Sequence, residues 1–102
     1  MVNDKKVIFV DIDNTICDSP DDGDYYKCVP RLKYIEKINK LYDDGHRIVY
    51  WTARGAKTKI NWYEFTKKQL NDWGCRYTKL WTSKPFFDLM IDDKTKRIEE
   101  IE

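Results

Sequence analysis

The stretch Lys5–Ile16, KKVIFVDIDNTI, decides how the rest of the chain is interpreted. Its apolar run, residues 7–10, has the length and β-branched composition of a buried strand. Asp11 and Asp13 follow at once, and residues two apart in an extended chain point to the same side. Two like charges held together require a cation or a shared proton. From this stretch alone, the two aspartates either cap a turn or belong to a site.

The composition indicates one globular domain, residues 1–102, without an evident nucleic-acid or membrane partner. A 41% hydrophobic content with charges spread along the chain excludes the disordered and fibrous classes. The net charge of +1 and the lack of a basic run disfavour nucleic acid. No apolar stretch approaches the roughly 20 residues of a membrane span. The N-terminus, MVNDKK, lacks an apolar signal core, so we expect a cytoplasmic protein.

The cysteines and the histidine limit the chemistry further. Cys17, Cys28 and Cys75 are odd in number and widely spaced, so they predict neither a disulfide framework nor a metal site but three reduced thiols. His46 is the only histidine, which excludes a histidine-based triad and a zinc site with several histidines.

Helical and strand patterns alternate after the opening stretch. The polar segment Asp18–Val29 is predicted to be a loop or a short hairpin, and it either closes over a site or is a plain solvated connection. Apolar spacing predicts a helix that starts at Pro30 and ends before Gly45. His46–Trp51 is the second predicted strand.

A second helix, capped by Asn61 with Glu64 reaching back, is predicted to run to about Trp73. Three segments follow: a third strand at Tyr77–Leu80, a fourth at Phe86–Ile91 and a short terminal helix within Lys94–Glu102. This order predicts an α/β fold with a mostly parallel sheet of about four strands and right-handed crossovers.

Polar side chains follow every predicted strand at its carboxyl end, where sites lie in such sheets. They are Asp11 and Asp13, then Thr52 with Arg54 behind it, then Lys84, then Asp92 and Asp93. Carboxylates without a histidine cluster suit Mg²⁺, which favours a phosphate substrate. Lys84 would bind phosphoryl oxygens and Thr52 would donate a hydrogen bond to them. One aspartate would attack phosphorus while the other transfers protons, and the turn at residues 12–15 would add amide donors.

Four motifs, in this order, resemble those of the haloacid dehalogenase (HAD) superfamily of phosphatases. They are Asp11-Ile12-Asp13-Asn14-Thr15 as D-x-D-x-T, Thr52 after the strand IVYW, the lone Lys84, and Asp92-Asp93 after DLMI. The resemblance implies a three-layer, Rossmann-like sheet. It also implies that Asp11 is the nucleophile that forms a phosphoaspartate and that Asp13 is the general acid and base. Thr52 and Lys84 would be phosphoryl ligands.

The resemblance also implies a Mg²⁺ site. Its ligands would be Asp11, Asp13 through its backbone carbonyl, and one or both of Asp92 and Asp93. Neither gap between the motifs has room for a cap domain, so a capless member is expected, with the loop 18–29 as its only lid. The W-T-A-R-G stretch and the K-P before the final Asp pair are similar to small phosphatases of capsule or surface-polysaccharide synthesis.

Several residues have two interpretations each. Asn14 is a candidate substrate-binding residue or a turn former, and Arg54 is a substrate contact or a surface arginine paired with an aspartate of the 18–24 loop. Lys57, Lys59 and Trp62 would line a sugar or nucleotide pocket or lie in an exposed loop.

Three functions remain open on the sequence. The first is a Mg²⁺-dependent phosphomonoesterase acting on a sugar phosphate or another small phosphate. The second is a phosphatase acting on a macromolecule, such as a nucleic-acid 3′-phosphate or a phosphoprotein. The third is a non-catalytic phospho-accepting or binding module. The 15% aromatic content of so short a chain slightly favours a homo-oligomer.

Overall fold

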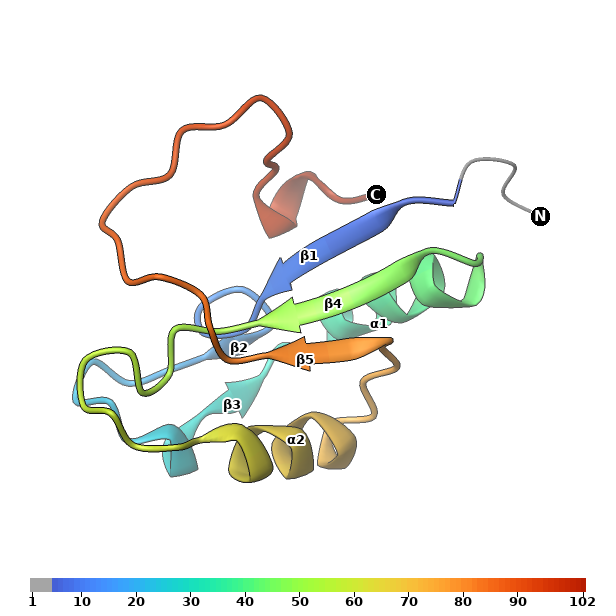
Figure 1. The fold of residues 1–102 in the computed structure, drawn as a ribbon. Helices are drawn as coiled ribbons and strands as arrows, with labels where there is room; N and C mark the ends of the chain where they lie inside the picture. The colour runs from blue at the N-terminus through green and yellow to red at the C-terminus, as the bar shows by residue number, and fades with distance from the viewer. Residues whose placement is uncertain (1–4) are drawn as a thin grey trace.

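A three-stranded parallel sheet forms the centre of the computed structural model, which describes residues 5–102 (Figure 1). Its strands are β1 (Val7–Asp11), β4 (Arg47–Trp51) and β5 (Lys79–Trp81), in the order β1-β4-β5. Val10 lies opposite Tyr50, which in turn lies opposite Leu80. The α/β class and the parallel pairing predicted from strand and helix alternation are therefore confirmed.

The two α-helices lie close to their predicted positions. α1 (Leu32–Asp43) precedes Gly45, whose φ of 106° is the left-handed value expected after a helix end. Pro30, however, belongs to a short strand and not to the helix. α2 (Tyr63–Asp72) begins without the expected capping box, because Asn61 Oδ1 accepts the hydrogen bond of the Tyr63 N–H.

Both helices cover the same face of the sheet, which gives two layers and not the three that the resemblance implies. Ile35 and Ile38 of α1 and Leu70 of α2 are buried in one cluster with Val10, Ile48, Tyr50 and Leu80 of the strands. The strand residues that point the other way include Val7, Phe9 and Trp81, which are exposed. The prediction of three layers is wrong for residues 5–102 because no described helix packs on that second face.

The predicted loop after β1 does contain a short hairpin. β2 (Cys17–Asp18) pairs antiparallel with β3 (Val29–Pro30), and a 3₁₀ turn, η1 (Tyr25–Lys27), lies between them. The hairpin places Ser19 and Cys28 beyond the carboxyl end of β1, where both contact the side chain of Asp13.

The segment Phe86–Ile91 is not a strand, contrary to the prediction. Its residues are exposed and lie within the long connection that leads away from the sheet after β5 (Figure 1). Only residues 82–85 separate it from β5, whereas two parallel strands of one sheet need a connection of about a dozen residues or more. Residues 94–102 form only a 3₁₀ turn, η2 (Ile98–Glu100), whose Ile98 returns to the core.

No cap domain occurs in the described part of the chain, as expected for a capless protein. Between residues 5 and 102, no helix is both long and apolar enough to cross a membrane. The expectation that no signal sequence is present depends partly on residues 1–4, which lie outside the described residues.

Candidate functional site

Asp11, the last residue of β1, is held by a lysine and a hydroxyl. Lys84 Nζ lies 3.0 Å from Asp11 Oδ1, and Thr15 Oγ1 donates a hydrogen bond of 3.2 Å to Asp11 Oδ2. The Lys84 side chain is only 12% exposed, and its ammonium also lies over the rings of Trp51 and Phe87. Two residues 73 positions apart therefore meet at the carboxyl end of the sheet, as the position rule for parallel sheets predicts.

The chain makes a tight turn directly after Asp11, and Asp13 lies within this turn. The amides of Thr15 and Ile16 both donate to the carbonyl of Ile12, which makes the predicted turn at residues 12–15. Asn14 has a φ of 59°, a left-handed conformation that asparagine tolerates well. Its Oδ1 accepts the Ser19 N–H at 3.0 Å, so in this structure Asn14 acts as a turn former.

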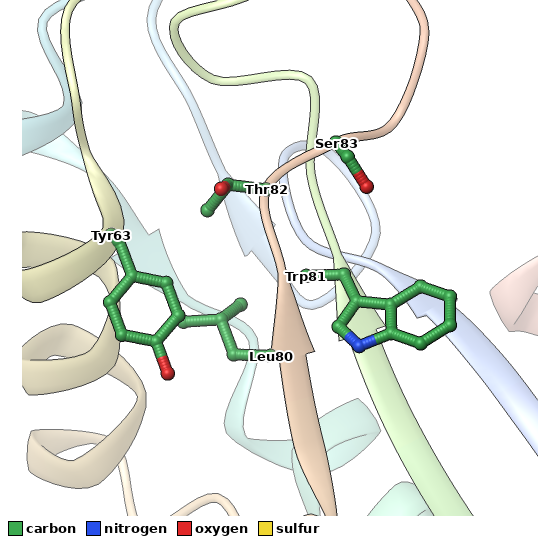
Figure 2. A pocket seen from close by; sticks show the side chains of 5 residues that line it. All are labelled: Tyr63, Leu80, Trp81, Thr82 and Ser83. Atoms are coloured by element: carbon green, nitrogen blue, oxygen red, sulfur yellow. The ribbon is translucent and has the colours of Figure 1, made fainter.

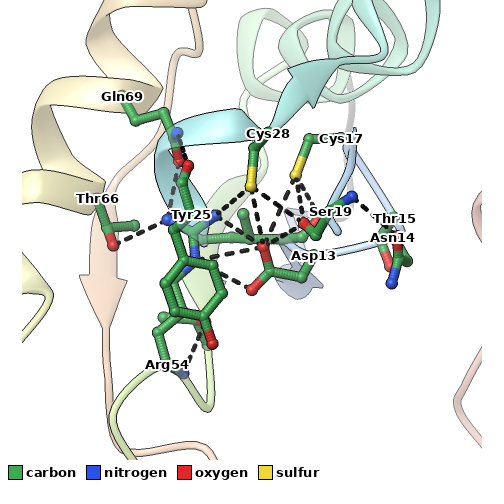
Figure 3. Close-up of polar contacts among 12 residues, drawn as sticks. Asp13, Asn14, Thr15, Cys17, Ser19, Tyr25, Cys28, Arg54, Thr66 and Gln69 are labelled. Atoms are coloured by element: carbon green, nitrogen blue, oxygen red, sulfur yellow. Dashed lines mark hydrogen bonds and ion pairs between the residues drawn. The ribbon is translucent and has the colours of Figure 1, made fainter. Parts of the chain in front are cut away.

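Asp13 is bound in a fork by Arg54 (Figure 3). Arg54 Nη2 donates to Asp13 Oδ1 at 2.7 Å, and Arg54 Nε donates to Asp13 Oδ2 at 3.0 Å. Ser19 Oγ adds a short bond of 2.6 Å to Asp13 Oδ1. Paired bonds of this kind fix the plane of a carboxylate as well as its position.

The Arg54 side chain is fully buried, and all its nitrogens have partners within the protein. Nη1 donates to Thr66 Oγ1 at 3.1 Å and to Gln69 Oε1 at 2.8 Å, both on α2. The guanidinium also lies 4.4 Å from the centre of the Tyr25 ring. The backbone carbonyl of Tyr25 accepts a hydrogen bond from Gln69 Nε2. Burial lowers the pKa of Arg54, but its hydrogen bonds with Asp13 and the charge of that carboxylate outweigh this effect, so the pKa stays above its ordinary value.

Arg54 thus occupies neither of the two places considered from the sequence. It is not a surface residue, and its partner is Asp13 of the D-x-D motif and not an aspartate of the 18–24 loop. In this arrangement no guanidinium nitrogen is left free for a substrate.

The chain around Arg54 is shaped by its neighbours. Thr52 is buried at the end of β4, and its Oγ1 accepts the Arg54 N–H at 3.1 Å. Gly55 has a φ of 86°, and a Cβ there would lie 2.1 Å from the carbonyl oxygen of Ile60. Only glycine fits this position, because the side chain of any other residue would collide with backbone. The loop after β4 therefore folds back tightly and directs Arg54 inward.

Two thiols complete the surroundings of Asp13. Cys17 and Cys28 each lie close to Asp13 Oδ1, at 3.8 and 3.9 Å, and Ser19 Oγ contacts both sulfurs (Figure 3). Burial, more than the nearby Asp13 charge, raises the pKa of Cys17 to about 12. Asp13, Cys17 and Cys28 are the one group of three metal-donor side chains found in close contact among residues 5–102. It suits Mg²⁺ poorly, because two donors are sulfur and Arg54 brings a positive charge.

Asp92 and Asp93 are exposed and lie on the segment that leads away from the sheet. The side-chain interaction with Asp93 and, to a lesser extent, the backbone amide of Lys94 hold the pKa of Asp92 below its ordinary value. In the portion of the chain that is described, the side chains of Asp11, Asp92 and Asp93 are not gathered into one metal-donor group. The structure therefore brings together Asp11 with Lys84 and Asp13 with Arg54, and it leaves the Asp92-Asp93 pair apart.

Two hollows lie near these residues. The larger, about 420 Å³, is lined by Tyr63, Leu80, Trp81, Thr82 and Ser83 beside β5, and contains none of the charged site residues (Figure 2). The smaller, about 260 Å³, is lined by Ala53 and Gly55 on either side of Arg54 and by residues of both loops, including Asp22, Tyr25, Lys57 and Trp62. Lys57 and Trp62 thus line a hollow as considered from the sequence, whereas Lys59 is exposed outside it.

Comparisons with known proteins support the fold of this chain but do not indicate its function. No protein-family model matches the chain, and no curated protein matches it. A crystal structure of a Vibrio cholerae protein that carries no functional name is similar, with a TM-score of 0.83 and 27% identity. The match covers 94% of this chain and 86% of that one. The fold therefore recurs, over nearly its whole length, in an experimentally determined structure.

The sequence did not single out several side chains around Asp13, namely Ser19, Tyr25, Cys28, Thr66 and Gln69. Their polar atoms come from the hairpin and from one face of α2. Thr66 and Gln69 are three residues apart, which places them on the same face of a helix. Their role as acceptors for Arg54 depends on where the Arg54 side chain lies, which the sequence does not indicate.

Proposed function

We propose that this protein is a Mg²⁺-dependent phosphomonoester hydrolase of the HAD type, in which Asp11 attacks the phosphoryl group and becomes a phosphoaspartate. The single observation that supports this most strongly is the 3.0 Å contact between Lys84 Nζ and Asp11 Oδ1 at the carboxyl end of β1. A carboxylate and an ammonium held together there offer a nucleophile and a ligand for phosphoryl oxygens in one place.

The groups around Asp11 have complementary roles in this proposal. Thr15 Oγ1 bonds to Asp11 Oδ2, which orients the carboxylate and directs Oδ1 toward Lys84. Thr52 Oγ1 accepts a backbone N–H and so keeps its own hydrogen for donation to a phosphoryl oxygen. Attack by an Asp11 oxygen forms the P–O bond as the ester oxygen leaves with the electron pair of the broken bond.

Asp13 is the proposed proton carrier, and Arg54 is its positioning residue. The guanidinium fork and Ser19 hold the carboxylate of Asp13 in one orientation beyond the strand end. From there it would protonate the leaving oxygen and later accept a proton from the water that hydrolyses the phosphoaspartate. Arg54 is assigned this positioning role in place of the substrate contact, because its nitrogens are already bonded.

The proposed Mg²⁺ is not matched by the residues of one chain. Mg²⁺ prefers several oxygen ligands in octahedral geometry. Asp11 is available, but Asp92 and Asp93, the other carboxylates expected to bind the ion, lie on an exposed segment. We therefore assign to a single chain only the roles of Asp11, Asp13, Thr52 and Lys84 in the reaction.

A small phosphate ester, with a sugar phosphate as the first candidate, is the proposed substrate. The hollow of about 260 Å³ beside Arg54 combines an indole, a phenol ring, an ammonium and a carboxylate, from Trp62, Tyr25, Lys57 and Asp22. Aromatic faces with hydrogen-bonding groups at their edges suit a polyhydroxylated ring. The proposal includes a place in surface-polysaccharide synthesis, as the motif resemblance implies, and a cytoplasmic location.

A panel of phosphate esters, assayed with Mg²⁺ and again with EDTA, tests the function. We expect release of inorganic phosphate from sugar phosphates and from an aryl phosphate in Mg²⁺, and loss of release in EDTA. Turnover of a nucleic-acid 3′-phosphate or phosphopeptide alone would favour the macromolecular substrate instead. No release from any ester in Mg²⁺ would favour a non-catalytic phosphate-binding module.

A further inference from the structure

We propose that a second copy of this chain completes the sheet, with its residues 86–91 paired in parallel along the outer edge of β1. The exchange would bring the partner copy's Asp92-Asp93 pair to the carboxyl end of β1, where Asp11 lies. The role of these carboxylates as metal ligands rests on the proposed function, whereas the strand pairing itself does not.

The first observation is an exposed apolar segment. Phe86, Phe87, Leu89, Met90 and Ile91 are all exposed, with Leu89 at 74% and Ile91 at 90%. This run has strand-forming composition, yet it pairs with none of the strands among residues 5–102. Several exposed apolar side chains so close together in the sequence of a small protein favour an interaction site.

The second observation is the open edge of β1. Among the described strands β1 pairs only with β4, so its other side is a sheet edge. Val7 and Phe9 beside this edge are 59% and 41% exposed. Natural proteins cover or interrupt such edges, and an extended segment of another chain is a common way to cover one.

The short connection between β5 and residues 86–91 determines whether this segment can pair with β1 of its own chain or only with β1 of another copy. Residues 82–85 are too few to return to the start of the sheet, so residues 86–91 cannot run parallel to β1 of their own chain. An antiparallel pairing within the chain is short enough, but it would place Asp92 and Asp93 at the opposite end of β1 from Asp11. Only the segment of another copy can both run parallel to β1 and end beside Asp11.

The segment is built as an arm anchored at both ends. It leaves the sheet after Trp81, and the chain returns to its own core at Ile98, while Lys37 Nζ donates to the Ile101 carbonyl at 2.7 Å. Two copies can therefore exchange arms reciprocally, so that each arm extends the partner's sheet and the assembly closes as a two-fold dimer. This exchange would bury the apolar arm and supply the oxygen ligands that one chain lacks.

A photo-crosslinking experiment tests the pairing without any assay of activity. A benzophenone amino acid at position 89, in an equal mixture of isotopically light and heavy protein, should give light–heavy crosslinked pairs joined to residues 7–11. The same group at position 36, an exposed site on α1, should not. Light scattering should show a dimer for the wild-type protein and for Lys33→Asp, and a monomer for Leu89→Asp. A wild-type monomer, or crosslinks confined to one chain, would overturn the proposal.

Complementation tests the delivery of the carboxylates. Asp11→Asn and the double variant Asp92→Asn/Asp93→Asn should each be inactive, whereas refolding them together should restore roughly a quarter of the wild-type rate, because about half the dimers gain one intact site of two. No restoration, with dimers present, would overturn the shared site. An active wild-type monomer would refute the exchange alone, and crosslinked dimers without phosphatase activity would refute the proposed function alone.

Discussion

Arg54 Nη2 lies 2.7 Å from Asp13 Oδ1, and this ion pair joins the loop after β4 to the turn after β1. The two residues are 41 positions apart in the chain. The arginine side chain is wholly buried and the aspartate side chain is 24% exposed, so the pair is far less screened by water than the surface pairs of this protein. It therefore holds the site together as well as orienting Asp13.

Arg54→Met should destabilise the protein strongly. The substitution leaves Asp13 beside an apolar group and removes the partners of Thr66 and Gln69, so we expect the free energy of unfolding to fall by about 3 kcal/mol. Urea unfolding followed by tryptophan fluorescence measures this. The control is Arg76→Met, which removes a half-exposed pair with Asp43 and should lower the free energy of unfolding far less. Equal losses in the two variants would contradict the structural role of Arg54.

Asp13→Asn should slow turnover by roughly 10²–10⁴-fold, since it removes general acid and base help. The single side-chain oxygen of an asparagine cannot accept from both arms of the Arg54 fork, so the variant should also lose stability, and the rates are compared at a temperature where circular dichroism shows both proteins to be folded. The assay is aryl phosphate hydrolysis in Mg²⁺, with the surface substitution Asp72→Asn on α2 as the control. If Asp13→Asn kept the rate of the control, the proton-transfer role would belong to another group.

The three thiols should differ sharply in reactivity. Burial raises the pKa of Cys17 to about 12 and that of Cys75 to about 11, so at pH 8 less than roughly one molecule in a hundred carries either thiolate. The half-buried Cys28 should react first with a disulfide reagent, and Cys28→Ser should remove the fast phase. Raising the pH toward 11 should speed labelling of Cys75 before Cys17. Equal rates for all three in the folded protein would contradict the burial of Cys17.

The sequence was sufficient to predict the elements whose patterns are local. β1, β4, α1 and α2 were found within a few residues because apolar periodicity, a turn or a glycine after the helix marks each one. The meeting of Asp11 with Lys84 was also predictable, because both follow strands that a parallel sheet brings together at one edge.

The fourth strand shows where pattern reasoning failed. The run at residues 86–91 has strand composition, but composition carries no information about whether the chain can reach a pairing position. The four residues 82–85 were visible in the sequence and already excluded a parallel neighbour in the same chain. The Arg54–Asp13 pair lacked any such local signal, since it depends on the sharp turn at Gly55 and on α2 residues that surround the guanidinium.

The central claim, that Asp11 is the attacking group, is tested most directly by the hydrolysis of an aryl phosphate in Mg²⁺ by Asp11→Asn. An amide at this position keeps the size of the side chain, but its one neutral oxygen is a poor nucleophile, so we expect no detectable hydrolysis, while Asp72→Asn hydrolyses at the wild-type rate. Hydrolysis by Asp11→Asn at a rate comparable to the wild type would show that the nucleophile lies elsewhere and would contradict the account.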